Sequence, residues 1–344
     1  MMKRTFLYIL TAFILLSCHS GKDIPDISHI KVNLQVMRFD KDLFALDSSN
    51  LNRSIASLSA KYPQFYRDFM TNILGVDPKD SMAGEILVKF IHDFKVIKEK
   101  SDQKFQNIDA ISSEVKDLLR RTKYYFPEYR QPEKLIAFIG PMDAFYENSL
   151  GWSGDIITSE GLAIGLQMHL GSDAPFYAES QGSGYPLYIS RRFEPEYIVV
   201  NCARNIVDDI FPEKSVAVTL VEQMVDKGKR MYAVDQLLPT VPDSIKIGYT
   251  ASQLKACYNN EGLIWNMFLQ NNLIYESDFQ KTKSFLSEGP KTAELGDDSP
   301  GYITLFTGWQ IVKAYMEKYP KTSLIQLMDL DNRKLFELSK YKPK

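Results

Sequence analysis

Apolar residues recur at helical spacing along most of this chain, and the exceptions lie near its middle. Nine segments carry such a stripe and are predicted to be helices: 51–74, 82–100, 112–125, 195–207, 214–234, 252–271, 277–286, 304–318 and 323–327. In contrast, Lys134–Ile139 is a β-branched and aromatic run, and residues 31–39 alternate between apolar and polar. The sequence therefore predicts a predominantly helical α+β protein with a small sheet near the middle of the chain.

Local signals refine this prediction. Pro63 is expected to bend or split the helix over 51–74, because proline lacks the backbone N–H that a helix interior uses. Thr250 with Gln253, and Ser323 with Gln326, have the spacing of capping boxes at helix N-termini. Further short segments remain ambiguous: 155–158 is a possible strand, 162–170 fits strand or helix, and 171–190 resembles a loop.

The N-terminus has the composition of an export signal. Lys3 and Arg4 precede an apolar run over residues 6–16, which is too short for a bilayer core that needs about 20 residues. The sequence Leu15-Leu16-Ser17-Cys18 resembles the lipobox of bacterial lipoproteins, in which a peptidase cuts before the cysteine and the thiol carries a diacylglycerol. Attachment of two or more acyl chains makes membrane binding stable. The alternative is an ordinary signal peptide with a chance cysteine.

These features divide the chain into four parts. Residues 1–17 are the predicted signal peptide and 18–30 a polar, lipidated tether. Residues 31–130 form a mainly helical N-terminal half, and 131–344 an α+β half that is expected to make one compact unit with the first. The anchor predicts a membrane-bound protein that faces the periplasm, and it leaves open whether the membrane is the inner or the outer one.

Charge, cysteine content and missing motifs argue against nucleic-acid-binding, disulfide-bonded and cofactor-dependent proteins. The net charge is −2 and no basic block stands out, so a nucleic-acid partner is not expected. Besides Cys18 the chain contains Cys202 and Cys257, for which two buried free thiols are favoured over a disulfide. No cofactor is expected, because neither a P-loop nor a G-x-G-x-x-G motif occurs.

Catalytic and metal-binding motifs are also missing from the sequence. The histidines have no HExxH spacing, and there is no CxxC pair or G-x-S-x-G elbow, so no catalytic residue and no metal ligand is assigned. His92 is expected in solvent, and His169, in an apolar run, is expected to be packed and not catalytic. Paired carboxylates remain open, because 43 acidic residues offer many pairs.

Five residues form a candidate cleft. Gly228 lies on the apolar stripe of the helix that also carries Glu222 and Lys227, where a glycine permits close approach of another backbone or lines a cleft. Glu261 shares an apolar stripe with Trp265, so its carboxylate must be hydrogen-bonded or paired, or belong to a pocket.

Several short segments resemble the GldB family of gliding-motility lipoproteins, in an order that covers nearly the whole chain. They are 38–44, 193–198, 228–232, 235–239, 248–250, Gln253, Cys257, Asn260, Glu261, Trp265, 299–301, 308–312 and 341–343. The resemblance implies a role in gliding motility and the cell-envelope machinery, with other envelope or motility proteins as partners. It does not imply a reaction.

A weaker resemblance is to predicted zinc metallopeptidases. Residues 201–205, Asn-Cys-Ala-Arg-Asn, stand where the family has HExxH, and Lys227-Gly228 stands where it has Glu-Gly. The resemblance implies a peptidase-like scaffold, but asparagine, arginine and lysine do not replace the zinc ligands. It therefore implies a degenerate metallopeptidase-like scaffold that lacks its metal.

Three functions remain open at this point. The favoured one is a non-catalytic lipoprotein that binds a protein or an envelope polymer. The second is an unrecognised hydrolase of peptide or glycan that uses carboxylates. The third is a sugar-binding module, suggested by 19 tyrosines and three tryptophans, although buried aromatic residues explain that count equally well.

Overall fold

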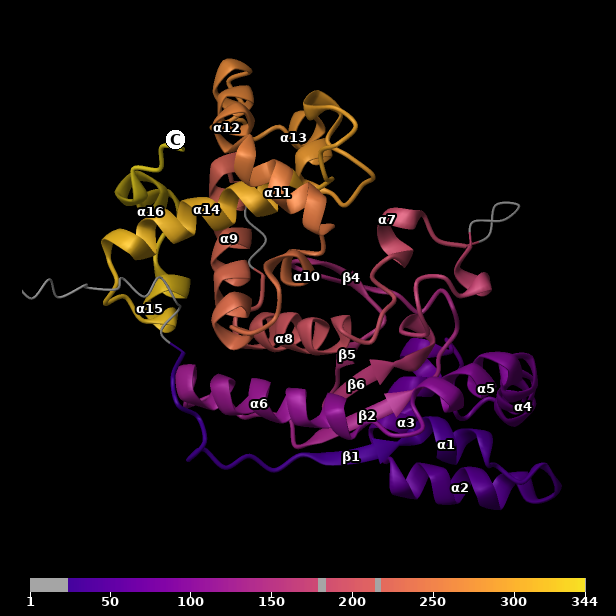
Figure 1. Cartoon of the computed structure of the whole chain (residues 1–344). Helices are drawn as coiled ribbons and strands as arrows, with labels where there is room; N and C mark the ends of the chain where they lie inside the picture. The colour runs from indigo at the N-terminus through magenta and orange to yellow at the C-terminus, as the bar shows by residue number, and fades with distance from the viewer. Residues whose placement is uncertain (1–23, 179–183, 214–217, 344) are drawn as a thin grey trace, which may run out of the picture.

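The structure is a computed structural model that describes residues 24–178, 184–213 and 218–343, so Cys18 and the predicted signal peptide lie outside the described residues. The first part of the chain forms β1 (Gln35–Arg38), α1 (Phe39–Phe44), a 3₁₀ turn (Ser48–Asn50), α2 (Leu51–Lys61), α3 (Phe65–Asp68), a π-helical turn (Phe69–Ile73), α4 (Ala83–Asp93), α5 (Lys95–Lys104) and α6 (Asp109–Tyr125). The chain then enters the sheet region (Figure 1).

The middle and last parts complete the fold. The middle contains β2 (Lys134–Phe138), β3 (Tyr146–Asn148), β4 (Gly151–Ser153), β5 (Ile156–Ile157), β6 (Leu162–Gly165), 3₁₀ turns at Leu166–Met168 and Pro175–Tyr177, and α7 (Leu187–Ser190). The last part contains α8 (Tyr197–Ile210), α9 (Leu220–Leu237), α10 (Asp243–Ile247), α11 (Ala251–Asn259), α12 (Glu261–Gln270), α13 (Phe279–Leu286), a 3₁₀ turn (Ala293–Leu295), α14 (Ile303–Lys318), α15 (Leu324–Asp329) and α16 (Asn332–Ser339).

The sheet joins the first part of the chain to the middle. Its order is β1-β2-β6-β5, with β1 and β6 parallel to β2 and β5 antiparallel to β6. Gln35 pairs with Lys134, so the strand predicted over residues 31–39 lies beside the one predicted over 134–139. The structure thus confirms a small mixed sheet in a mostly helical α+β protein, and strands β3 and β4 add a separate two-stranded ribbon.

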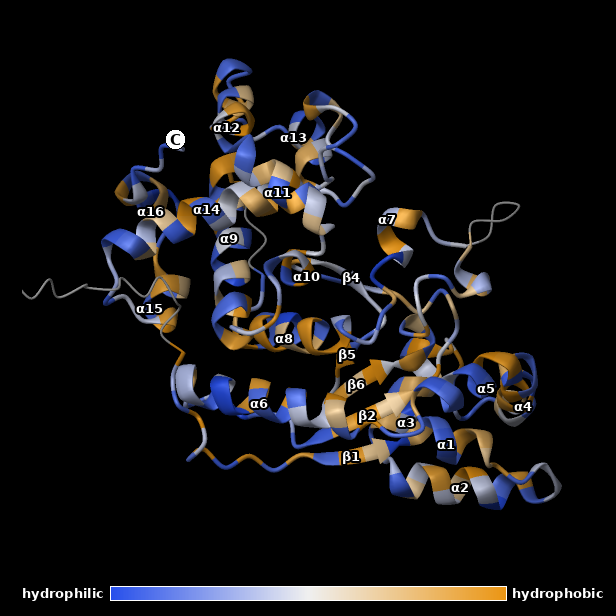
Figure 2. Cartoon of the chain, viewed as in Figure 1, coloured by the Kyte–Doolittle hydropathy of each residue, from blue (hydrophilic) through white to orange (hydrophobic). Residues whose placement is uncertain are grey.

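Aromatic side chains pack the N-terminal helices against the central strand. Phe39 lies edge-on to Phe65 with ring centroids 4.9 Å apart, and Phe65 lies 5.6 Å from Phe138 of β2. Apart from Lys134, the residues of β2 and β6 are buried and lack polar side chains, and orange in Figure 2 marks the apolar character of both strands. The apolar run predicted from the sequence is therefore the centre of the core.

The C-terminal helices cross α9. In Figure 1, α14 passes over α9, and Gly228 of α9 faces Gly308 of α14. A Cβ atom on Gly228 would lie 2.2 Å from the carbonyl oxygen of Gly308, and one on Gly308 would lie 1.8 Å from that of Met224. Gly228 therefore permits the close backbone approach that the sequence suggested.

The structure corrects the bounds of several helices. The helix predicted over 82–100 is divided at Phe94, and the one over 252–271 is divided at Asn260. The described part of the helix predicted from residue 214 begins at Leu220. Both predicted capping boxes are confirmed, at the N-termini of α11 and α15. Helices α10 and α16 and the β3–β4 ribbon were not predicted from the sequence.

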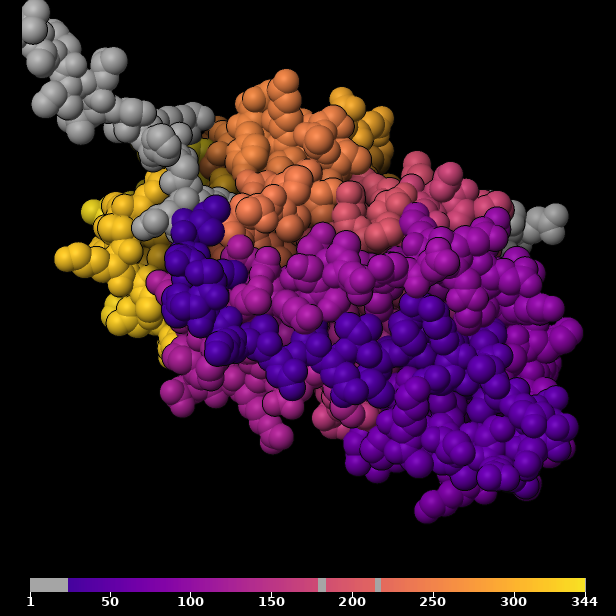
Figure 3. All heavy atoms as spheres, turned by 60° about the horizontal axis from the view of Figure 1, so that its bottom comes forward, coloured from indigo at the N-terminus to yellow at the C-terminus, as the bar shows by residue number. Residues whose placement is uncertain are grey.

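The first described residues run along the outside of the molecule. Figure 3 shows this indigo segment lying over the magenta surface, where the backbone oxygen of Ile30 accepts a hydrogen bond of 3.2 Å from Arg120 of α6. Within the described ranges, no helix combines the length and hydropathy needed to span a bilayer.

Candidate functional site

The predicted cleft residues on α9 have local partners. Glu222 completes a capping box with Thr219 at the start of α9, and Lys227 forms an ion pair of 2.5 Å with Glu213. Gly228 packs against the backbone of Gly308 in α14. These three residues thus cap, pair and pack their own helix.

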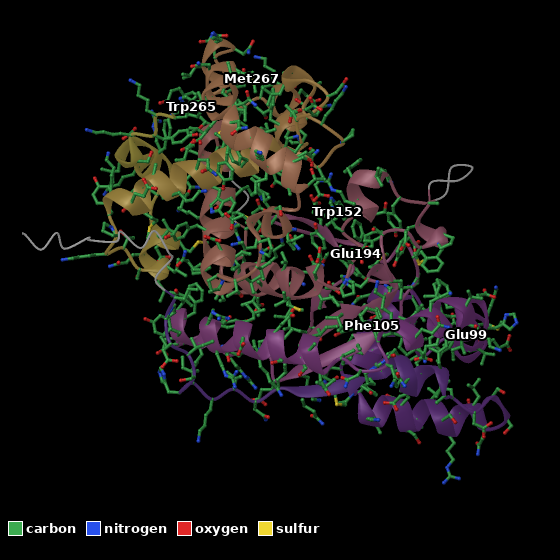
Figure 4. The ribbon with its side chains drawn as sticks, in the orientation of Figure 1. Glu99, Phe105, Trp152, Glu194, Trp265 and Met267 are labelled. Carbon is green, nitrogen blue, oxygen red and sulfur yellow. The ribbon has the colours of Figure 1, made fainter. Side chains whose placement is uncertain are left out.

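The other two predicted residues meet the C-terminus. Glu261 accepts a hydrogen bond of 2.7 Å from the hydroxyl of Tyr341, and the ring of Trp265 lies edge-on to Tyr341 at 5.1 Å. Burial, followed by Glu261, raises the pKa of Tyr341. Figure 4 shows Trp265 on α12, in a different part of the molecule from Trp152 on β4. Glu261 and Trp265 come together around Tyr341, whereas Glu222 and Lys227 have separate partners.

A buried polar group that the sequence did not single out lies where α8 meets the sheet. Asp155, between β4 and β5, is 1% exposed. Its carboxylate accepts hydrogen bonds from the backbone N–H of Gly165 (2.9 Å) and the amide of Asn201 (2.7 Å), and it contacts Nε2 of His169 at 2.9 Å. Asp155, His169, Asn201 and Asn205 are called the Asp155 cluster below.

Helix α8 supplies both asparagines. Asn201 and Asn205 are four residues apart, so they lie on one face of the helix. The amide of Asn205 donates to the backbone oxygen of Asp155 at 2.9 Å. The two amides therefore fix α8 to the β4–β5 connection by side-chain and backbone contacts to a single residue.

His169 is held from both sides. Its Nδ1 lies 3.1 Å from the backbone oxygen of Glu194, and its Nε2 faces the Asp155 carboxylate. The two contacts hold the ring in one orientation between Glu194 and the β4–β5 connection. The histidine is buried as the sequence predicted, and it contacts a buried carboxylate in the core.

Three arginines lie close to this cluster. Arg192 forms a two-pronged ion pair with Glu288, at 2.6 and 2.7 Å. Arg191 donates to the backbone oxygen of Gly248 at 2.9 Å, and Arg204 donates to that of Lys246 at 2.8 Å. Arg191, Arg192 and Arg204 are called the arginine cluster.

Positive charge is concentrated at the arginine cluster. Burial, and then the neighbouring Arg192, lowers the pKa of Arg204 to about 10, and the same two causes lower the pKa of Arg191. Among the described residues, the Nε atoms of Arg191 and Arg204 are buried without a hydrogen-bond partner. An unpartnered buried donor costs free energy, so an added acceptor would stabilise it.

Two small hollows meet at Arg192. The first is lined by Phe145, Trp152, Ser153, Gly154, Met168, His169, Arg192, Phe193, Tyr197, Asn201 and Arg204. The second is lined by Leu150, Tyr188, Arg191, Arg192, Ile247, Gly248, Tyr249, Glu288, Gly289, Gly301, Tyr302 and Leu305. Trp152 is 40% exposed and stacks on Phe145 with a centroid distance of 5.9 Å and an interplanar angle of 15°.

Residues 201–205 of α8, which the weaker resemblance aligns with HExxH, do not offer a zinc donor set, and nothing in the described part of the structure supports a metallopeptidase-like scaffold. Zinc is bound by imidazole, thiolate or carboxylate, and Asn201 and Asn205 present amide N–H groups to Asp155. Burial raises the pKa of the intervening Cys202 thiol well above its usual value, so this thiol stays protonated. Cys202 and Cys257 are both buried and free. Across residues 24–178, 184–213 and 218–343, no His, Cys, Asp or Glu side chains assemble into a group that could hold a metal ion.

The sequence did contain signals for this site. Arg204 interrupts an apolar helix, and a buried charge requires partners from other elements. The pair Arg191-Arg192 follows a loop-like segment, where binding residues often occur. Asp155 and Glu288 carried no such signal, because their partners are distant in the sequence.

The fold and the site define a mostly helical α+β protein in which a buried carboxylate and an arginine cluster border small hollows. The chain belongs to the family described as gliding motility protein GldB, whose model matches residues 20–343. This match confirms the resemblance found in the sequence and identifies the protein as a gliding-motility-related lipoprotein. Neither the curated proteins nor the solved structures gave a significant match.

Proposed function

We propose that this protein is held on the periplasmic side of a membrane by lipid on Cys18 and acts by binding a partner in the gliding-motility or cell-envelope machinery, without catalysis. The family membership supports the setting. The molecular role is our inference from the site.

One observation carries the non-catalytic role. On α8, where the metallopeptidase resemblance would place metal ligands, Asn201 and Asn205 donate their amide hydrogens to Asp155. Asp155 also accepts from Gly165 and contacts His169, so its oxygens are committed to the protein itself. A general base must be able to reach a substrate proton, and this carboxylate is occupied and buried. The cluster therefore supports a structural role for these positions of α8.

The proposal is tested by crosslinking in intact cells with the lipidated protein. We expect a specific envelope protein or polymer to be captured by the wild type. Cys18→Ala is expected to release the protein from the membrane and to abolish gliding. Partner capture is also measured for an Arg192→Gln variant and for a Glu261→Ala, Lys227→Ala variant. The first tests the arginine cluster, and the second tests the cleft predicted from sequence.

A turnover assay tests the alternative that the protein is a hydrolase. The purified protein is incubated with peptide and glycan mixtures, next to Asp155→Asn and Glu288→Gln variants whose folding is checked by circular dichroism. Turnover by the wild type that either variant abolishes would show a carboxylate hydrolase and overturn the proposal. Absence of any specific crosslinked partner would overturn it as well.

A further inference from the structure

We propose that the hollows meeting at Arg192 form a binding site for an acidic sugar residue, whose carboxylate pairs with the arginine cluster while its ring lies against Trp152. This inference rests on the proposed function and names the class of partner, namely a carboxylate-bearing glycan.

The charge balance at the site favours an anion. Glu288 supplies a carboxylate to Arg192, whereas Arg191 and Arg204 donate to backbone oxygens of Gly248 and Lys246. Arg191 also donates to the neutral amide of Gln253 at 3.1 Å. Three guanidinium groups thus lie around one carboxylate. A guanidinium fork matches a carboxylate with two parallel hydrogen bonds, which makes a ligand carboxylate the fitting counter-ion.

Unpartnered donors point to the same ligand. Arg204 is 2% exposed and lines the first hollow, and among the described residues its Nε has no hydrogen-bond partner. Arg191 lines the second hollow, and its Nε is also buried without a hydrogen-bond partner among the described residues. Buried polar atoms in folded proteins nearly always have a partner, so those that lack one need an explanation. An incoming carboxylate oxygen would supply the missing acceptor.

Trp152 favours a sugar over a peptide. Its indole is 40% exposed, stacks on Phe145, and lines the same hollow as Arg192 and Arg204. Figure 4 shows Trp152 on the side of the molecule between the N-terminal and C-terminal helices. A flat ring with an open side is suited to the apolar face of a pyranose, whereas extended peptides are usually bound along a strand edge. The hollows are small, so the sugar ring would lie outside them, against Trp152, with its carboxylate at their mouth beside Arg192.

Two glycines preserve the space around the ion pair. Gly151 has φ +131°, and a Cβ atom there would lie 2.2 Å from Oε1 of Glu288. Gly248 has φ +82°, and a Cβ atom there would lie 3.4 Å from Cδ of Arg192. A side chain at Gly151 would displace Glu288, and both backbone conformations favour glycine. Glycine at these two positions therefore leaves room for the ion pair between Arg192 and Glu288 beside the hollows.

The test is isothermal titration calorimetry with cellotriuronic acid, with cellotriose as the neutral sugar of the same length, and with a tri-aspartate peptide. We expect the wild type to bind the acidic sugar at least tenfold more tightly than either of the others. Trp152→Ala and Arg192→Gln are each expected to weaken this binding about tenfold, the effect of losing one charge-assisted or stacking contact.

Glu288→Gln gives the sharpest result. Removing the internal carboxylate frees Arg192, so we expect binding of the acidic sugar to become several-fold tighter, which loss of a merely structural ion pair would not produce. Arg333→Gln on α16, an exposed arginine paired with Glu337, is the matched control and should leave affinity unchanged. Circular dichroism checks folding, and Trp152→Ala, at an exposed position, keeps the test valid where a buried variant fails to fold.

Three outcomes overturn the inference: equal affinity for the acidic and the neutral sugar, binding of the peptide alone, or no binding of any probe at millimolar concentration. If one of these occurs while crosslinking still captures a specific partner, the proposed function stands and only the sugar site is wrong. If both experiments fail, the binding role fails with it.

Discussion

Helices α9 and α8 are both buried, but they are held in opposite ways. Helix α9 packs on α14 through Gly228 and Gly308, where backbone meets backbone. Helix α8 is fixed to the sheet by amides that converge on Asp155. The first contact depends on the absence of side chains and the second on particular polar atoms. A core of one protein thus combines steric fit with hydrogen-bond matching, and the two respond differently to substitution.

The largest effect is expected at the glycine crossing. In Gly308→Ala the new Cβ would lie 1.8 Å from the backbone oxygen of Met224, so the helices must separate. We expect a loss of more than about 3 kcal/mol in the free energy of unfolding, measured by urea denaturation. Gly84→Ala in α4 is the control, because its Cβ would meet only the flexible end of Leu51, at 3.2 Å, and Ile55. Similar losses for both variants would contradict the steric account.

Asp155→Ala tests the polar attachment of α8. It leaves Asn201, His169 and the N–H of Gly165 without their acceptor in the core. We expect a loss of about 3 kcal/mol in the free energy of unfolding, since buried unpaired groups keep their desolvation penalty. Asp93→Ala, which removes an exposed ion pair with Lys89, should leave the urea midpoint unchanged. An equally small shift for Asp155→Ala would mean that α8 is held by apolar packing alone.

Lys229 is one of the buried charged residues of α9, and it makes stability depend on pH. Its ammonium donates to the backbone oxygen of Met328 at 3.2 Å, yet burial lowers its pKa from 10.5 to about 8. Between these two values the unfolded chain holds a proton that the folded chain has lost, so stability rises with pH.

We expect wild type to gain roughly 2 kcal/mol relative to Lys229→Met between pH 8 and 9.5, at about 1.4 kcal/mol per pH unit. The difference should become constant below about pH 7, where Lys229 is protonated in both the folded and the unfolded state. Urea denaturation of both proteins at several pH values measures it. Parallel curves for the two proteins across this window would show that the folded-state pKa of Lys229 is not lowered.

The smallest change in stability is expected at the contact between Tyr341 and Glu261, one of the residues of the cleft predicted from sequence. Tyr341→Phe removes the hydroxyl that donates to Glu261 at 2.7 Å and leaves the ring on Trp265. A loss of about 1 kcal/mol in the free energy of unfolding is expected from one hydrogen bond. Tyr319→Phe, at an exposed position, is the control. If Tyr341→Phe instead abolished partner capture without changing stability, the Glu261 region would be the functional surface.

The contrast also explains what could be predicted from sequence. A glycine on an apolar helical stripe has a local signature, and Gly228 was correctly expected to meet another backbone. The apolar run over residues 134–139 likewise has a local signature, and it correctly predicted the central strand. The partners of Arg204 and Asp155 come from segments far along the chain, and single-sequence periodicity carries no information about such pairs. Hence the elements were largely predictable, whereas the polar site was visible only as an arginine in an apolar helix and an arginine pair after a loop-like segment.

The pairing of β1 with β2 has a consequence for how the chain reaches its native state. Residues 35–38 are synthesised early, but their strand partner begins at Lys134, with six α-helices between them. Closing so long a loop slows folding, because its entropy is lost before the contacts form. The backbone groups of β1 therefore remain unpaired until β2 is available. A chaperone that shields this strand edge is expected to raise the yield of folded protein.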